Sequence, residues 1–184
     1  MRIFRLKAGL LTRTMIMILE TERLQLRRLT LDDTEFVLRL LNEPSFIQNI
    51  GDRGVRTIDD ARGYIVKGPI TSYEKFGFGL WMVETRSPIV PIGICGLLKR
   101  DVLDDVDIGY ALLPEFWSQG YALESASAVI SYAGEKFGLK RVVAVTNSDN
   151  HSSIRLLEKM GFKYERMVRL SEDAPEIKLF AAEV

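Results

Sequence analysis

The stretch from Asp105 to Phe137 constrains the fold more than any other part of the sequence. Asp105–Leu113 reads as a β-strand, and Gln119–Phe137 reads as an amphipathic helix. The buried stripe of that helix would comprise Ala122, Ala126, Val129, Ala133 and Phe137. Gly120 lies in the turn where the strand runs into the helix. Such a turn leaves consecutive backbone N–H groups unpaired at the positive end of the helix dipole, which favours the binding of a phosphate.

A second strand-to-helix turn, Asn147–Ser153, is rich in amide and hydroxyl side chains. It follows a predicted strand, Arg141–Thr146, and precedes a predicted helix, Ser153–Met160. A ligand that carries both a pyrophosphate and a chain of amides is coenzyme A, so the two turns together predict a coenzyme A site. Each turn alone is also consistent with an ordinary helix N-terminus, and neither is a G-x-G-x-x-G motif or a P-loop.

The remaining segments contain no repeat, low-complexity tract or Pro/Gly-rich linker. We therefore predict an α+β fold in a single domain, residues 19–184, with a central mixed, twisted sheet flanked by helices. The other expected strands are Arg23–Arg28, Gly79–Glu84, Ile92–Lys99, Phe162–Leu170 and Glu176–Ala182. The other expected helices run from Thr30 to Leu41 and from Thr57 toward Tyr73, with a glycine-containing loop, Phe46–Val55, between them.

Composition limits the classes of partner and compartment. The 25 lysine and arginine residues balance 25 aspartate and glutamate residues, so bulk charge gives no reason to expect nucleic-acid or membrane binding. The sequence contains no cluster of acidic residues that would predict a metal site. The single cysteine, Cys95, lies in an apolar run and is expected in the core, which suits a reducing, cytoplasmic location. Residues 1–18 are expected to form a disordered extension, or to precede an alternative start at Met17.

Several motifs together resemble one enzyme family. They are Ile108-Gly-Tyr-Ala-Leu-Leu-Pro-Glu-Phe-Trp-Ser-Gln-Gly-Tyr-Ala-Leu-Glu124, then Asn147-x-x-Asn150-x-x-Ser153, and then Leu157-Glu-Lys-Met-Gly-Phe162. This order resembles the GNAT superfamily of acyl-CoA N-acyltransferases, in particular the branch that includes the ribosomal-protein-alanine N-acetyltransferases. Glu20-Thr-Glu-Arg-Leu-x-Leu-Arg also matches the usual opening strand of that branch. The resemblance thus covers the chain from Leu19 to the C-terminus and implies acetyl-CoA as co-substrate.

The resemblance also implies a set of donor-binding residues. The backbone from Trp117 to Ala122 would cradle the pyrophosphate, and the strand Tyr110-Ala-Leu112 would pair with the pantetheine arm. Asn147 and Asn150 would bind pantetheine amides, with Ser153 near the sulfur. The implied cofactor-binding residues are Tyr110, Ala111, Leu112, Trp117, Ser118, Gln119, Gly120, Tyr121, Ala122, Asn147, Asn150 and Ser153.

Two positions depart from the superfamily pattern. Trp117 replaces the common Gln or Arg, which suits the ribosomal-alanine branch, and its aromatic ring also fits a core or rim position. Leu157 stands where many members carry the tyrosine that protonates the leaving thiolate. That role would fall to Ser153, to water, or to no group at all.

Three carboxylates are candidates for the base that deprotonates the amine. Asp107 precedes Ile108-Gly-Tyr, where many members place an acid facing the acceptor, and Glu172 matches an acid of the ribosomal-alanine branch. Glu124 follows the phosphate turn but would point away from the thioester. The single histidine, His151, is expected at a solvent-facing helix start. Asp107, Ser153 and Glu172 are therefore the catalytic candidates, with the choice between the two carboxylates left open.

The acceptor is the least specified part of the function. An α-amine has a reference pKa of about 7.7–8.0 and lysine one of about 10.4, so a site with weak bases suits a protein N-terminus. We expect acetyl transfer to the α-amine of a small N-terminal residue, by a monomer or homodimer. The alternatives are a small amine such as a polyamine or an aminoglycoside, a non-catalytic acyl-CoA-binding module, and a phosphate- or nucleotide-binding module.

Overall fold

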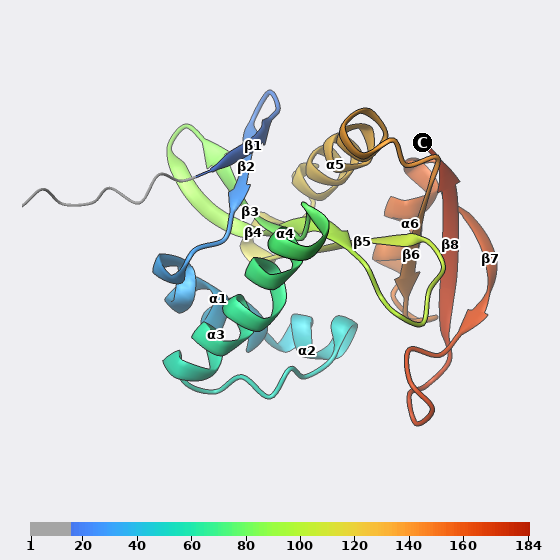
Figure 1. The fold of residues 1–184 in the computed structure, drawn as a ribbon, viewed down its shortest axis with the longest axis horizontal. Helices are drawn as coiled ribbons and strands as arrows, with labels where there is room; N and C mark the ends of the chain where they lie inside the picture. The colour runs from blue at the N-terminus through green and yellow to red at the C-terminus, as the bar shows by residue number, and fades with distance from the viewer. Residues whose placement is uncertain (1–15) are drawn as a thin grey trace, which may run out of the picture.

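The computed structural model of the chain describes residues 16–184 and contains an eight-stranded mixed sheet with helices on both faces (Figure 1). The strand order is β1-β2-β3-β4-β5-β6-β8-β7, and β5 and β6 form its parallel pair. The strands are β1 (Met17–Glu20), β2 (Leu24–Arg28), β3 (Leu80–Arg86), β4 (Ile89–Leu98), β5 (Val106–Leu112), β6 (Arg141–Thr146), β7 (Lys163–Val168) and β8 (Ile177–Glu183). This arrangement confirms the predicted α+β class and the mixed sheet flanked by helices.

The helices lie in the connections between these strands. They are η1 (Leu31–Asp33), α1 (Thr34–Leu41), α2 (Pro44–Ile50), α3 (Ile58–Ile65), η2 (Val66–Ile70), α4 (Thr71–Phe76), η3 (Pro114–Phe116), α5 (Tyr121–Phe137) and α6 (His151–Lys159). In residues 16–184, no helix is both long enough and apolar enough to cross a membrane.

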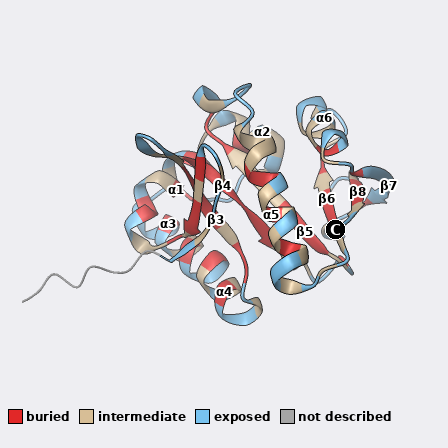
Figure 2. Ribbon diagram, turned by 90° about the horizontal axis from the view of Figure 1, so that it is seen from above, coloured by how far each residue is buried: buried red, intermediate tan, exposed pale blue. Residues whose placement is uncertain are grey.

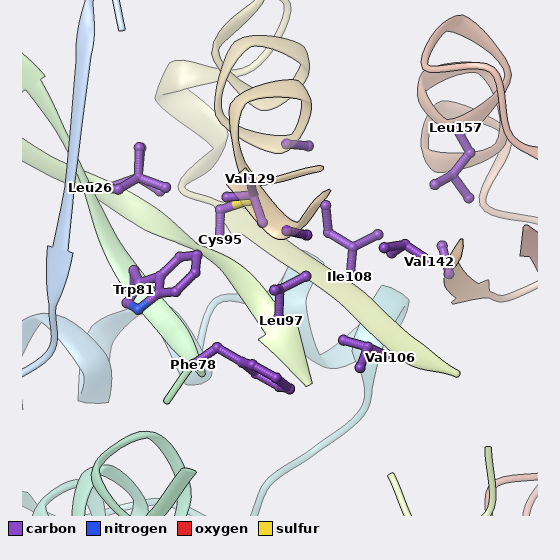
Figure 3. Packing of buried hydrophobic residues seen from close by; sticks show 14 of the residues in the cluster. Leu26, Phe78, Trp81, Cys95, Leu97, Val106, Ile108, Val129, Val142 and Leu157 are labelled. Atoms are coloured by element: carbon purple, nitrogen blue, oxygen red, sulfur yellow. The ribbon is translucent and has the colours of Figure 1, made fainter. Parts of the chain in front are cut away.

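The side chains of β5 alternate between the two faces of the sheet, as strand geometry requires. Ile108 and Leu112 belong to a core cluster with Ala126 and Val129 of α5 and with Leu157 of α6 (Figure 3). The opposite face packs against helices of the first half of the chain. There, Val37, Leu40 and Leu41 of α1 and Ala61 and Ile65 of α3 cover Met82 and Ile94. The inner sides of these helices are buried and their outer sides are exposed (Figure 2).

Cys95 lies on β4 in the cluster under α5 and is fully buried. Burial raises the pKa of its thiol to about 12, so the thiol stays protonated and unreactive at neutral pH. The prediction that this residue is part of the core is confirmed.

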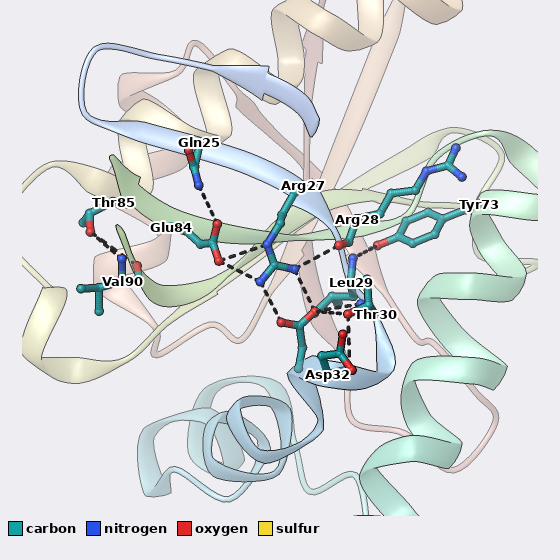
Figure 4. Close-up of polar contacts among 11 residues, drawn as sticks. Gln25, Arg27, Arg28, Leu29, Thr30, Asp32, Tyr73, Glu84, Thr85 and Val90 are labelled. Carbon is teal, nitrogen blue, oxygen red and sulfur yellow. Dashed lines mark hydrogen bonds and ion pairs between the residues drawn. The ribbon is translucent and has the colours of Figure 1, made fainter. Parts of the chain in front are cut away.

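A buried ion network ties the start of the first helical segment to the sheet (Figure 4). The Arg27 guanidinium lies 2.7 Å from Asp33 Oδ1 and 2.8 Å from Glu84 Oε1, and all three residues are buried. Asp33 also accepts a hydrogen bond of 2.8 Å from the Thr30 amide. Because losing one partner would leave a buried charge unpaired, the network fixes how β2, β3 and η1 meet.

The structure corrects two of the predicted elements. Residues 46–55 were expected to form a loop, but α2 occupies 44–50, because Pro44 begins a helix well and Phe46 is buried in the second core cluster. The helix expected from Thr57 toward Tyr73 is divided into α3, a π-helical turn η2 and α4. Pro69 lies in that turn, where its missing N–H disturbs the regular hydrogen-bond ladder.

The structure also adds a strand before the expected domain start at residue 19. β1 begins at Met17 and pairs antiparallel with β2, with Met17 opposite Arg27. Met17 and Ile18, which were expected to lie in the extension of residues 1–18, belong to the sheet, and the alternative start at Met17 stays a prediction. Residues 1–15 of that extension lie outside the described residues.

Candidate active site

A cavity opens where the two parallel strands separate. β5 and β6 pair only at Val106–Val142 and Asp107–Val143, whereas β5 stays paired with β4 as far as Leu112. The edge of β5 from Ile108 onward is thus free of its neighbour β6. The opening is part of a cavity of about 970 Å³, whose walls come from β5, β6, α2 and the N-terminal ends of α5 and α6. An exposed strand edge of this kind can pair with an extended ligand that carries amides.

The turn before α5 has the backbone shape of an anion cradle. Ser118 and Gly120 have φ angles of 60° and 83°, in the left-handed region. Within residues 16–184, no hydrogen bond engages the backbone amides from Ser118 to Leu123. These amides lie at the N-terminus of a helix of 17 residues, and each residue of the segment except Gln119 lines the cavity. The geometry therefore fits a pyrophosphate, because unpaired amides and the helix dipole both favour a bound anion.

Trp117 is fixed at the edge of this cradle. Its indole Nε1 donates a hydrogen bond of 2.8 Å to the Leu112 carbonyl, and 47% of the residue is exposed. The ring therefore occupies the rim of the cavity and anchors the end of β5 to the turn. The sequence was consistent with a core or a rim position for Trp117, and in the structure the residue lies at the rim.

Two hydroxyl groups meet in the wall on the α5 and α6 side. Tyr110 Oη of β5 and Ser153 Oγ of α6 lie 2.8 Å apart and form a hydrogen bond. Burial raises the pKa of Tyr110 to about 12, although the bond with Ser153 acts in the opposite direction. Tyr110 therefore stays protonated at physiological pH. The predicted role of Tyr110 concerned its backbone only, and its side-chain partner was missed because it lies 43 residues away in sequence.

The two asparagines have partners inside the protein. Asn150 caps α6, since its Oδ1 accepts a hydrogen bond of 3.1 Å from the Ser153 amide. Asn147 Nδ2 donates long hydrogen bonds of 3.4 and 3.3 Å to the carbonyls of Gln48 and Asn49, in α2. Both asparagines line the cavity. The Asn147 contact joins the β6–α6 turn to α2 across the cavity, a connection that the sequence did not reveal.

Of the three carboxylates predicted as candidates for the base, Asp107 is the one that lines the cavity. It is fully buried, and its Oδ2 accepts a hydrogen bond of 2.6 Å from Arg100 Nε. Among the described residues, its other oxygen, Oδ1, has no hydrogen-bond partner. Burial raises the pKa of Asp107 to about 6, against the opposing effect of Arg100. This is a carboxyl group that gains and loses a proton close to neutral pH, as a general base requires.

The other two carboxylate candidates do not line the cavity, whereas the single histidine does. Glu172 is in the exposed loop between β7 and β8 and is not among the cavity-lining residues. Glu124 of α5 binds Thr21 and Arg23 and does not line the cavity. His151 is exposed at the first position of α6, as expected. The structure thus groups Asp107 with the predicted donor-binding residues and leaves Glu172 outside that group.

Two cavity-lining cations on α6 were also missed. Arg155 and Lys159 follow His151 at intervals of four residues, so the three residues share one face of the helix. A basic stripe in the wall of the same cavity would favour the negatively charged phosphates of a ligand. The four-residue spacing after the Asn150 cap was the signal in the sequence that indicated this face.

Comparisons with known proteins identify the family of the chain. The sequence profile described as an acetyltransferase (GNAT) domain matches residues 23–163. An uncharacterized N-acetyltransferase of Bacillus subtilis, YoaA, is 35% identical over 157 residues, which span 84% of this chain and 88% of that protein.

Solved structures share the fold. The ribosomal L7/L12 alpha-N-protein acetyltransferase RimL, in complex with coenzyme A, aligns with a TM-score of 0.78 and 18% identity, covering 91% of this chain and 98% of its own. The microcin C7 self-immunity acetyltransferase MccE, in complex with acetyl-CoA and AMP, aligns with a TM-score of 0.76 and 19% identity, covering 89% and 94%. The chain belongs to the GNAT family and is an acetyl-CoA-dependent N-acetyltransferase.

Proposed function

We propose that this enzyme acetylates the α-amine of a protein or peptide N-terminus, with Asp107 as the base that removes the amine proton. The observation that carries the proposal is the buried Asp107 carboxylate in the cavity wall, with a pKa of about 6. An α-ammonium group has a pKa of about 8, so proton transfer to Asp107 is unfavourable by roughly two units. The same transfer from a lysine ammonium, with a pKa of about 10.4, is unfavourable by more than four.

Acetyl-CoA supplies an activated acetyl thioester, and the residues of this chain divide the remaining work. The amides from Ser118 to Leu123 bind the pyrophosphate, and the free edge of β5 from Ile108 onward aligns the pantetheine arm. Arg100 holds Asp107 in place through its 2.6 Å bond and leaves Oδ1 free to accept a proton. The side chain of Asp107 projects to the α1–α3 face of the sheet, opposite to that of Tyr110.

The hydroxyl pair of Tyr110 and Ser153 lies on the other face, beside α5 and α6. A hydroxyl there donates a hydrogen bond to the sulfur as negative charge develops on the departing thiolate. The pair would then have the role of the tyrosine that many superfamily members carry at the position of Leu157. Leu157 itself is buried in the core and has no polar group to offer.

The acceptor class is tested by measuring thiol release from acetyl-CoA with matched acceptors. The panel contains peptides beginning with Ala or Ser, the same peptides with a blocked N-terminus and an internal lysine, a polyamine and an aminoglycoside. We expect turnover with free N-termini and at most background release with the blocked peptides. Faster turnover with the polyamine or the aminoglycoside would overturn the proposed acceptor and leave the acetyltransferase assignment intact.

A further inference from the structure

The turn between β1 and β2 reaches across to the start of α5. Glu124 Oε1 accepts hydrogen bonds from Thr21 Oγ1, at 2.6 Å, and from the Arg23 amide, at 2.9 Å. Its second oxygen, Oε2, accepts from Arg23 Nε at 2.7 Å and lies 2.6 Å from Arg23 Nη2. Segments about a hundred residues apart in the sequence are thus joined by one carboxylate whose side chain is 17% exposed.

The same arginine also contacts the phosphate cradle itself. Arg23 Nη1 donates a hydrogen bond of 2.9 Å to the Gln119 carbonyl, and its guanidinium lies 4.6 Å from the centre of the Tyr121 ring. A Cβ atom placed on Gly120 would lie 3.2 Å from Arg23 Nη2. Arg23 therefore contacts Gln119 and Tyr121 and lies next to Gly120 between them.

The Gln119 contact determines where the next amide points. In a trans peptide, the carbonyl of one residue and the N–H of the following residue point in opposite directions. Because the Gln119 carbonyl is turned toward Arg23, the Gly120 N–H points away from Arg23. The left-handed conformation of Ser118, which is unfavourable for a residue with a side chain, must also be held by its surroundings.

We propose that Arg23 and Glu124 form a clamp that holds the Ser118–Tyr121 turn in its phosphate-binding shape, which makes Arg23 a positioning residue of the coenzyme A site. The motif Glu20-Thr-Glu-Arg-Leu24, which contains Arg23, would thereby contribute to donor binding. The proposal rests on the family assignment and is independent of the acceptor. It is more than a surface ion pair, because Arg23 bonds a backbone carbonyl of the turn as well as the carboxylate.

The clamp is tested by calorimetry with two ligands that differ in their phosphates. Coenzyme A has the pyrophosphate, whereas pantetheine lacks it and keeps the amide arm. We expect Arg23→Ala and Glu124→Ala each to weaken coenzyme A binding by about tenfold or more, equivalent to ~1.4 kcal/mol, and to leave pantetheine affinity within about twofold. An equal loss for both ligands would contradict a role at the phosphates.

The double variant separates a clamp from a direct phosphate ligand. If Arg23 and Glu124 act as one unit, the double variant binds coenzyme A no more weakly than either single variant. If Arg23 bound the phosphate directly, Glu124→Ala would leave or raise the affinity, and that result would overturn the proposal. Hydrogen exchange without ligand gives a second readout, since both single variants should speed exchange at the amides of 118–123.

A matched control comes from α3. Arg62 forms an exposed ion pair with Asp59 at 3.1 Å, and neither residue lines the cavity. Arg62→Ala removes a comparable charge and should leave the affinities for both ligands unchanged. These measurements need no acceptor, so the result for the clamp is independent of the proposed acceptor. An enzyme that fails to acetylate peptides could still show the clamp, and an enzyme that acetylates peptides could lack it.

Discussion

The hydroxyl groups of Tyr110 and Ser153, 2.8 Å apart, join the middle of β5 to the first turn of α6. The bond crosses from one strand of the splayed pair to the helix that follows the other strand. It places two protonated oxygens in the cavity wall, on the face opposite to that of the Asp107 side chain. The arrangement separates the group that takes a proton from the groups that support the departing sulfur.

Removal of either hydroxyl should slow turnover without weakening donor binding. We expect Tyr110→Phe and Ser153→Ala to lower kcat by roughly 10- to 100-fold, because less charge on the sulfur is stabilised. Since the pKa of Tyr110 is about 12, the loss should be constant between pH 6 and pH 9. Steady-state kinetics with acetyl-CoA across this range check the expectation. A loss confined to the KM for acetyl-CoA would indicate that the pair only supports binding.

Asp107 should determine the acidic limb of the pH profile. Asp107→Asn should lower kcat/KM by about 10²-fold or more at pH 7.5, and less at pH 9, where more of the acceptor amine is already neutral. In the wild-type enzyme, activity should rise as the pH passes through about 6, because Asp107 accepts a proton only when ionised. Equal losses at both pH values would instead assign Asp107 to packing.

The same carboxyl group should also affect stability. Its pKa in the folded protein, about 6, lies above the reference value of about 3.9, so the folded state binds the proton more tightly. The stabilisation is present below the unfolded pKa and is lost as the pH rises through the folded pKa. The stability of Asp107→Asn relative to wild type should therefore increase between pH 5 and pH 8, by roughly 1–1.5 kcal/mol, because the rest of the effect lies below pH 5. Urea unfolding at the two pH values measures this change, and a constant difference would contradict the raised pKa.

Gly120 offers a direct test of the phosphate cradle. Gly120→Pro removes one amide and demands a φ near −65°, whereas the native angle is 83°. We expect coenzyme A binding to be lost in calorimetry while the protein stays folded. Gly138→Pro at the other end of α5 is the control for the change in φ, since Gly138 has a positive φ of 65° and does not line the cavity, although its amide also donates a hydrogen bond of 3.0 Å to the Gly134 carbonyl. Similar affinities for the two variants would place the pyrophosphate elsewhere.

The parts of the site that follow from local rules could be predicted from the sequence. The glycine turn before α5 and the Asn150 cap of α6 each depend on a few adjacent residues, and both have the predicted form. Leu157 could be identified as a departure from the family pattern because the Gly161-Phe162 pair fixes its position.

The parts that depend on distant contacts could not be predicted. The partners of Tyr110 and Arg23 lie 43 and about a hundred residues away, and no periodic pattern connects them. The helix α2 was read as a loop because its short sequence contains polar residues and is followed by glycines, whereas the burial of Phe46 against α1 favours the helix. Asp107 was a candidate base through the family resemblance alone, and only the packing of the sheet shows that it is fully buried.

The most direct test of the proposed function is the site of acetylation on one peptide that carries a free N-terminal alanine and an internal lysine. Mass spectrometry after incubation with the enzyme and acetyl-CoA at pH 7.5 should find acetyl on the α-amine and almost none on the lysine. Asp107→Asn should reduce this product by about 10²-fold. Acetyl found mainly on the lysine, or an undiminished product with Asp107→Asn, would contradict the account.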